Sequence, residues 1–232
     1  MLNRDAIRSG AYLESFDSLP AELLWTQQRI EQSLAETLAQ RPDDASDVWV
    51  FAYGSLMWNP LAAIEHREVA VLDGWHRSFC MRIVAARGSP QNPGRMLSLE
   101  PGGSTQGIAL RLPPLLADEE LRIIWIREMV TGAYRPAWAR VRLADGTVTH
   151  AIAFVANPAH PHHEADSRPS CVAPLIARAA GSFGSNAEYV FRLQQALAEH
   201  ALTDAYIDEL TRRLSLLAQR HEPTRAHPDA ER

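Results

Sequence analysis

A short apolar run that breaks abruptly into a glycine turn limits the fold of this chain more than any other feature. Val48-Trp49-Val50-Phe51-Ala52 is rich in β-branched and aromatic residues, which is typical of a buried strand. Tyr53-Gly54-Ser55-Leu56 follows at once, and its glycine allows a sharp turn whose N–H groups can approach a carboxylate or a developing oxyanion. Taken alone, the tetrapeptide favours an ordinary turn, because turn glycines are common.

Further short apolar segments, separated by glycine and proline, predict a strongly bent sheet or a barrel. The expected strands are 68–72, 78–84, 95–99, 107–112, 137–143 and 148–156. Helices are expected at 20–39, from 118 onward, at 186–200 and at 203–219, and the polar segment 157–168 is expected to be a loop. Because strands and helices do not alternate as β-α-β units, the predicted fold class is α+β. We expect one domain over residues 1–220 with an N-terminal helix, and a disordered tail over 221–232.

Composition excludes several classes of protein. The 232 residues carry a net charge of -5 without any block of like charges, which argues against nucleic acid or an anionic membrane as the main partner. No apolar run approaches the roughly 18 residues of a membrane span, and the N-terminus lacks a signal-peptide core. The two cysteines, Cys80 and Cys171, make a disulfide framework improbable and favour a cytoplasmic location. Each is expected to be a buried, inert thiol rather than a nucleophile.

Glu128 places a carboxylate on an otherwise apolar helical face. It follows Leu121 by seven positions and Ile124 by four, so the three side chains share one side of the predicted helix. An ionised carboxylate is costly to bury, so it must pair, become protonated or take part in chemistry. Two interpretations stay open: an acid–base residue whose pKa is raised by burial, or a structural ion pair. The arginines considered as its partners are Arg77, Arg82 and Arg95.

Two other segments carry residue types that are used in catalysis. His160-Pro161-His162-His163-Glu164 has the residue types of a metal site, but it lies in a proline-broken loop without helical i, i+4 spacing. We therefore expect a solvated loop there and no metal. Ser55 could be a nucleophile, yet the surrounding sequence lacks the G-x-S-x-G pattern of a nucleophile elbow.

Two arginines and two tyrosines are further candidates for ligand contacts. Arg77 and Arg95 either bind an anionic substrate or pair with carboxylates, and the sequence favours neither. Tyr134 and Tyr189 could donate hydrogen bonds to a ligand, although buried tyrosines with protein partners are the commoner case.

Five short motifs follow one another in order over most of the chain, and together they are more specific than any one alone. They are Val50-Phe51-Ala52-Tyr53-Gly54-Ser55-Leu56-Met57-Trp58-Asn59-Pro60, Gly74-Trp75-His76-Arg77-Ser78-Phe79, Pro93-Gly94-Arg95, Arg127-Glu128-Met129-Val130-Thr131-Gly132-Ala133-Tyr134 and Gly184-Ser185-Asn186-Ala187-Glu188-Tyr189. In this order they resemble the ChaC-like family of γ-glutamylcyclotransferases, and in particular its bacterial branch. One departure is Cys80, where many family members carry a large aromatic residue; it puts the shape of a side pocket in doubt.

The resemblance implies a small mixed β-barrel with flanking helices. It also implies that Tyr53, Gly54, Ser55 and Leu56 bind a γ-glutamyl group and that Glu128 is the catalytic acid/base. Glutathione would be the small-molecule substrate, and 5-oxoproline and cysteinylglycine the products. Further substrate contacts are expected from the remaining candidates, Arg77, Arg95, Tyr134 and Tyr189.

The implied reaction uses the substrate's own α-amine as nucleophile, so it requires no cofactor and no metal. Glu128 would take the proton from that amine and deliver it to the leaving amine. The turn at Tyr53–Leu56 would hold either the oxyanion or the substrate's α-carboxylate. Two alternatives remain: cyclotransfer from another γ-glutamyl amine or dipeptide, and a non-catalytic γ-glutamyl-binding module that regulates, for example, cation transport.

Overall fold

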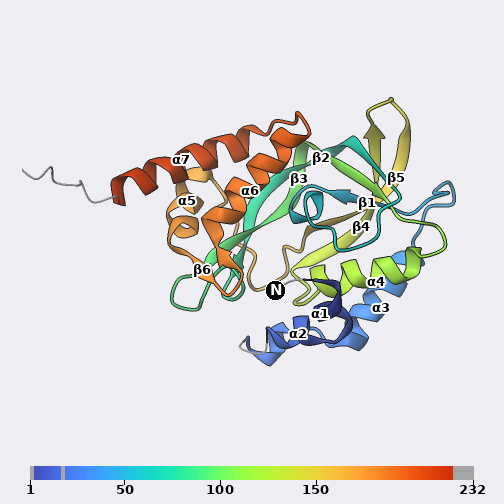
Figure 1. Cartoon of the computed structure of the whole chain (residues 1–232), viewed down its shortest axis with the longest axis horizontal. Helices are drawn as coiled ribbons and strands as arrows, with labels where there is room; N and C mark the ends of the chain where they lie inside the picture. Colours follow the sequence, from blue (N-terminus) through green and yellow to red (C-terminus); the bar gives the residue numbers. More distant parts are fainter. Residues whose placement is uncertain (1–2, 17–18, 222–232) are drawn as a thin grey trace, which may run out of the picture.

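Five strands close into a barrel in the computed structural model, which describes residues 3–16 and 19–221 (Figure 1). The strands are β1 (Trp49–Ala52), β2 (His66–Ile83), β3 (Gly94–Arg111), β4 (Tyr134–Leu143) and β5 (Val148–Ala156), in the spatial order β1-β3-β2-β4-β5. The pair β1–β5 is parallel and the other pairs are antiparallel. The prediction of an α+β fold built on a small mixed barrel is confirmed.

Two long strands replace four of the predicted short ones. β2 and β3 pair from His66↔Arg111 to Ile83↔Gly94, so each runs through a segment that looked like a turn. Register shifts lie between Asp73 and Trp75 and between Ser78 and Met81 of β2. Bulges of this kind bend a strand without ending it, and the bend closes the barrel.

Helices cover the barrel in two groups (Figure 1). The N-terminal group lies beside α4 (Ala117–Glu128) and consists of α1 (Arg4–Arg8), α2 (Ala11–Glu14), the short η1 (Ala21–Leu23) and α3 (Gln27–Leu38). The second group consists of α5 (Pro169–Arg178), α6 (Asn186–Glu199) and α7 (Ala205–His221), with the two-residue strands β6 (Ala180–Gly181) and β7 (Gly184–Ser185) between α5 and α6. Within the described part of the chain, no helix is both long and apolar enough to cross a membrane.

One predicted helix begins later than expected, and one helix was not predicted. The helix expected at 20–39 begins only at Gln27, because Thr26 is its N-cap and accepts a hydrogen bond from the N–H of Arg29. Helix α5 was not predicted; it begins directly after the expected loop at Pro169, which occupies the first turn, where no N–H is needed. The predicted tail over 221–232 lies outside the described residues, apart from the backbone of His221.

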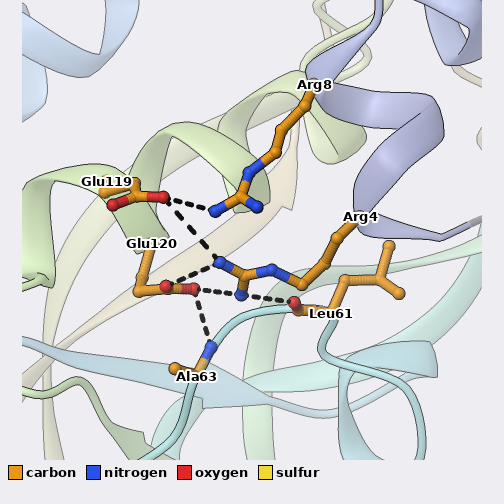
Figure 2. A network of polar contacts seen from close by, with 6 residues as sticks. All are labelled: Arg4, Arg8, Leu61, Ala63, Glu119 and Glu120. Atoms are coloured by element: carbon orange, nitrogen blue, oxygen red, sulfur yellow. Dashed lines mark hydrogen bonds and ion pairs between the residues drawn. The ribbon is translucent and has the colours of Figure 1, made fainter.

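An ion pair to a buried carboxylate fixes α4 against α1 (Figure 2). The Glu120 side chain is only 2% exposed, and its oxygens accept hydrogen bonds from Arg4 at 2.6 and 2.9 Å and from the N–H of Ala63 at 2.7 Å. Arg4 also donates to the carbonyl of Leu61 at 2.9 Å. Burial would raise the pKa of Glu120, but the hydrogen bonds from Arg4 and Ala63 outweigh it and lower that pKa. One contact set therefore joins α1, α4 and the segment that follows the glycine turn.

Candidate active site

The glycine turn is held in place by contacts with the barrel on both sides. It starts at the end of β1 and continues into the short helix η2 (Ser55–Met57). The Tyr53 hydroxyl donates to the carbonyl of Phe154 on β5 at 2.5 Å. The Tyr53 carbonyl accepts a hydrogen bond from Arg77 Nε on β2 at 2.8 Å. The turn is therefore part of the rigid barrel wall.

Glycine is required at position 54 for lack of space and not for its backbone conformation. Its φ of -136° is open to any residue. A Cβ at this position would lie 2.9 Å from the Tyr189 hydroxyl oxygen and 3.2 Å from Leu97 Cδ2. The Tyr189 ring cannot easily retreat, because it packs edge-on against Trp58 and Phe79 with centroids 5.5 and 6.2 Å away. Glycine brings the backbone of the turn directly against Tyr189.

Glu128 ends helix α4 beside this turn, with its side chain 14% exposed. Its ion-pair partner is the adjacent Arg127, whose Nε lies 3.0 Å from Glu128 Oε1. None of the arginines considered from the sequence is that partner. Burial raises the pKa of Glu128, and the positive charge of Arg127 opposes part of that rise. A buried carboxyl group with a raised pKa is suited to accept and return a proton.

Arg127 is the functional residue that the sequence reasoning missed. Its Nη2 donates to the Ser55 hydroxyl at 2.5 Å, and its Nη1 donates to the carbonyl of Asn59. Its own carbonyl accepts a hydrogen bond from the Tyr12 hydroxyl at 3.1 Å. The sequence did contain a signal for Arg127, which stands next to Glu128 in the same motif, but no role was predicted for this arginine. Arg127 links the carboxylate directly to the glycine turn.

The three tyrosines predicted as site residues all lie close enough to the carboxylate to feel its charge. Burial is the main cause that raises the pKa of Tyr53, Tyr134 and Tyr189, to about 12 for Tyr189, and the charge of Glu128 raises each of them further. All three phenols are therefore protonated at neutral pH and can donate hydrogen bonds. Tyr134 donates to the carbonyl of Leu97 at 3.0 Å, whereas the Tyr189 hydroxyl faces Gly54. Sequence motifs far apart in the chain thus meet around one carboxylate.

Arg77 and Arg95 occupy different environments. Arg77 is fully buried, and its three nitrogens donate to the Tyr53 carbonyl, the Gln106 carbonyl and the Asp204 carboxylate at 2.8, 2.6 and 2.8 Å. With all of its nitrogens engaged by protein oxygens, Arg77 holds the turn from behind.

The guanidinium group of Arg95 is only partly engaged by other described residues. Its side chain is 10% exposed, its Nη2 lies 3.6 Å from a Glu164 oxygen, and its buried Nε has no hydrogen-bond partner among the described residues. Its backbone is fixed by Asn186, which accepts from the Arg95 N–H at 2.7 Å and donates to the Arg95 carbonyl at 2.9 Å. Arg95 and Leu97 share one face of β3, about 7 Å apart along the strand. The unpartnered Nε of Arg95 therefore lies on the same face of β3 as Leu97, whose side chain lies against Gly54.

Comparison with known proteins shows the family to which the chain belongs. The sequence profile of the ChaC-like protein family matches residues 48–216. This chain belongs to the ChaC-like family. It is 44% identical over 210 residues to the glutathione-specific γ-glutamylcyclotransferase of Escherichia coli (strain K12), which covers 90% of each chain. It is 31% identical over 176 residues to glutathione-specific γ-glutamylcyclotransferase 1 of Homo sapiens, which covers 70% of this chain and 79% of the human protein.

The fold is also shared with a solved member of the same group of enzymes. The crystal structure of the yeast γ-glutamylcyclotransferase specific to glutathione superposes with a TM-score of 0.69 at 24% identity. The match covers 77% of this chain and all 100% of the yeast chain. The barrel with its flanking helices is therefore a fold that this chain shares with the yeast protein.

Two expectations about this ChaC-like chain need correction. Cys80 is buried as predicted, and burial together with the charge of Glu100 raises the pKa of its thiol to about 12, so the thiol is neutral. Cys171, in contrast, is only half-buried. The loop around His163 is packed rather than solvated: the His162 carbonyl accepts from the N–H of Arg82 at 2.8 Å. The loop lies on β2 because its backbone pairs with that strand next to Met81, which the sequence does not reveal.

Proposed function

We propose that this protein is a glutathione-specific γ-glutamylcyclotransferase, an enzyme that converts glutathione to 5-oxoproline and cysteinylglycine. The observation that carries the proposal is a buried carboxylate, Glu128, linked through Arg127 to Ser55 of the glycine turn. The ChaC-like family membership and the 44% identity to the E. coli enzyme over 90% of both chains support it.

The reaction we infer is an intramolecular aminolysis. The α-amine nitrogen of the γ-glutamyl group attacks its own γ-carbonyl carbon, which forms the new ring C–N bond and a tetrahedral oxyanion. The original amide C–N bond then breaks, and its electron pair leaves with the amine of cysteinylglycine. Holding the substrate in a folded shape supplies most of the advantage of such a ring closure.

Glu128 is assigned the proton transfers. A free α-amino group has a pKa of about 8, so much of it is protonated at neutral pH and cannot attack. Glu128, as a carboxylate, first takes one proton from the ammonium, which frees the nitrogen lone pair for attack, and then gives this proton to the leaving nitrogen as the amide bond breaks. The ring nitrogen passes its second excess proton through Glu128 to the leaving amine, so the carboxylate ends as it began. No cofactor takes part in these steps, since both the nucleophile and the leaving group belong to the substrate.

The remaining site residues are assigned to substrate binding. The N–H groups of Gly54, Ser55 and Leu56 hold the oxyanion or the α-carboxylate. Tyr53, Tyr134 and Tyr189 form the wall around Glu128. Arg95, with its unpartnered Nε, is assigned the carboxylate at the glycine end of glutathione. Arg77 is assigned a positioning role, since it holds the Tyr53 carbonyl.

The wider expectations belong to the same proposal. One shared hydrophobic core contains residues of α3, the barrel and α5 to α7, which supports a single domain over residues 1–220. Cys80 and Cys171 are both free thiols, which supports a cytoplasmic location. We propose a small molecule as the only substrate partner, with no nucleic acid or membrane involved.

The decisive experiment incubates the purified protein with reduced glutathione and measures 5-oxoproline. Glu128→Gln keeps the shape of the side chain but removes the titratable group, so this variant should fold normally and lose nearly all product. Substantial residual turnover by the folded variant would contradict the assigned role. Faster release of 5-oxoproline from γ-glutamyl dipeptides than from glutathione would favour the broader cyclotransferase alternative. Tight glutathione binding without any product would favour the regulatory binding module.

A further inference from the structure

Three side chains with strong metal affinity converge outside the proposed catalytic group. They are Cys80 on β2, Glu100 on β3 and His163 in the loop after β5, and their ligand atoms all lie within 4.8 Å of one another. The closest pair is His163 Nε2 and Glu100 Oε1, which are 3.0 Å apart. Three segments that are separate in the sequence thus contribute one ligand each.

The spacing fits a tetrahedral metal ion. With Zn–N and Zn–O bonds of about 2.0–2.2 Å and a Zn–S bond of about 2.3 Å, tetrahedral ligand atoms lie ~3.3 to 3.6 Å apart. The His163–Glu100 pair is already near this value, and the thiol needs to move by only about an ångström. Thiolate, imidazole and carboxylate together favour Zn²⁺ over Mg²⁺ or Ca²⁺, which prefer oxygen ligands.

The surroundings orient these ligands. The Ser78 hydroxyl donates to Glu100 Oε2, which leaves Glu100 Oε1 directed at His163. The N–H of Glu164 donates to the Cys80 carbonyl at 2.8 Å, and the backbone of His163 forms a bridge with Met81, so the loop is fixed to the strand that carries the thiol. Supporting contacts of this kind are what a metal site needs to hold its ligands ready.

We propose that Cys80, Glu100 and His163 form a binding site for Zn²⁺, with a fourth position open to water. Cys80 is fully buried, whereas the Glu100 and His163 side chains are 19% and 16% exposed, so the ion enters from their side. On binding, the Cys80 sulfur bonds to the ion and its proton passes to the buffer. The site is independent of the cyclotransferase reaction, which needs no metal.

The expected consequence is local rigidity next to the proposed active site. The ion joins β2, β3 and the 157–168 loop through one centre. Phe79, the neighbour of Cys80, packs edge-on against Tyr189 with ring centroids 6.2 Å apart. An occupied site therefore stiffens the strand that supports one wall around Glu128, and the stability of the fold rises with the logarithm of the Zn²⁺ concentration once that concentration exceeds the Kd.

The test uses the full-length protein after treatment with a chelator. Zn²⁺ titrated into it by calorimetry should bind with one equivalent and raise the Tm, and Co²⁺ should give the near-ultraviolet absorption of a cobalt–thiolate bond. Cys80→Ser and His163→Ala should each weaken Zn²⁺ binding by at least about tenfold. Cys80→Ser should also abolish the cobalt–thiolate absorption.

The chain offers a matched control for each variant. Cys171→Ser removes the other thiol, and His162→Ala removes the neighbouring imidazole, and both should bind Zn²⁺ like the unmodified protein. If Cys80→Ser fails to fold by circular dichroism, His163→Ala carries the test alone, because His163 lies in a partly exposed loop. Equal Zn²⁺ affinity in the unmodified protein and in folded His163→Ala, or a Co²⁺ complex without thiolate absorption, would overturn the proposal.

Discussion

At the scale of single residues, the central contact is the one that joins the Glu128 carboxylate to the glycine turn. Arg127 pairs with Glu128 and donates to Ser55, which lies 72 positions away in the sequence. The arginine therefore serves two purposes at once. It limits the rise in the pKa of Glu128 that burial causes, and it fixes the carboxylate relative to the glycine turn.

Arg127→Ala should change both the rate and the pH dependence of 5-oxoproline formation. The positive charge of Arg127 favours the ionised form of Glu128, so removing it raises the pKa of that carboxyl group further. The acid limb of kcat/KM against pH should therefore move to higher pH, and the maximal rate should fall by about tenfold or more as positioning is lost. Arg122→Ala, at an exposed arginine of the same helix, is the control. An unchanged acid limb in Arg127→Ala would refute the pairing.

Gly54→Ala should raise the KM for glutathione, because the new Cβ would lie 2.9 Å from the Tyr189 hydroxyl oxygen. We expect a loss of stability of about 1–3 kcal/mol from overpacking, measured by denaturant unfolding. The double variant Gly54→Ala, Tyr189→Phe removes that oxygen and should recover part of the lost stability. If the second substitution recovers none, the clash with Tyr189 is not the reason for glycine.

At the scale of elements, α4 is positioned by its first turn as well as by its last. Arg4 of α1 binds Glu120 near the start of α4 and the Leu61 carbonyl just beyond the glycine turn (Figure 2). The other end of the same helix presents Glu128 to that turn. Both contacts fix α4 against the same stretch of chain, so the N-terminal helix belongs to the framework of the site.

Arg4→Ala should destabilise the protein by about 1–3 kcal/mol at pH 7, because it leaves the buried Glu120 carboxylate without its main partner. The native contacts lower the pKa of Glu120, so their stabilisation is present above its ordinary value of 4.5 and is lost as pH falls through the lower native value. The difference in unfolding free energy between the two proteins should therefore shrink below about pH 4.

Arg8→Ala is the matched control for this prediction. Arg8 pairs with Glu119, and both side chains are about half exposed, at 54% and 51%. Exposed pairs of this kind contribute about 0–1 kcal/mol. Equal losses in Arg4→Ala and Arg8→Ala would show that burial of Glu120 does not matter.

At the scale of the whole molecule, one hydrophobic core contains residues of α3, α4, the barrel and α5 to α7. Arg77 crosses this core and ties the Tyr53 turn to Asp204, which lies directly before α7. Ile7 of α1 and Tyr12 of α2 pack in a smaller cluster with Ile123 of α4. Neither helix group is attached to the barrel by the surface alone. The molecule should therefore unfold as one unit.

Thermal unfolding followed by far-ultraviolet circular dichroism and by tryptophan fluorescence should give coincident transitions. Arg77→Gln should lower both midpoints together, because it leaves the Asp204 carboxylate and two carbonyls without their buried donors. Two separated transitions would contradict the proposal of a single domain over residues 1–220.

The sequence by itself determined the local features and the kinds of residue in the site. A β-branched run ending in Tyr53-Gly54-Ser55 predicted the strand and its turn, and helical spacing placed Glu128 on the buried face of α4. Gly74 was misleading, because it predicted a turn where pairing with β3 carries β2 through as a bulge. Helix α5, which contains Pro174, was not predicted.

Only the tertiary structure decided which side chains meet. Arg127 reaches Ser55 across 72 positions, Arg4 reaches Glu120 across 116, and His163 reaches Glu100 across 63. Periodicity reports which face of an element a residue lies on, but not what the closed barrel brings against that face. The physical reason is that each pair forms only when elements far apart in the chain pack together. Helix α4 packs against α1 and the glycine turn, and the loop after β5 packs against β2 and β3.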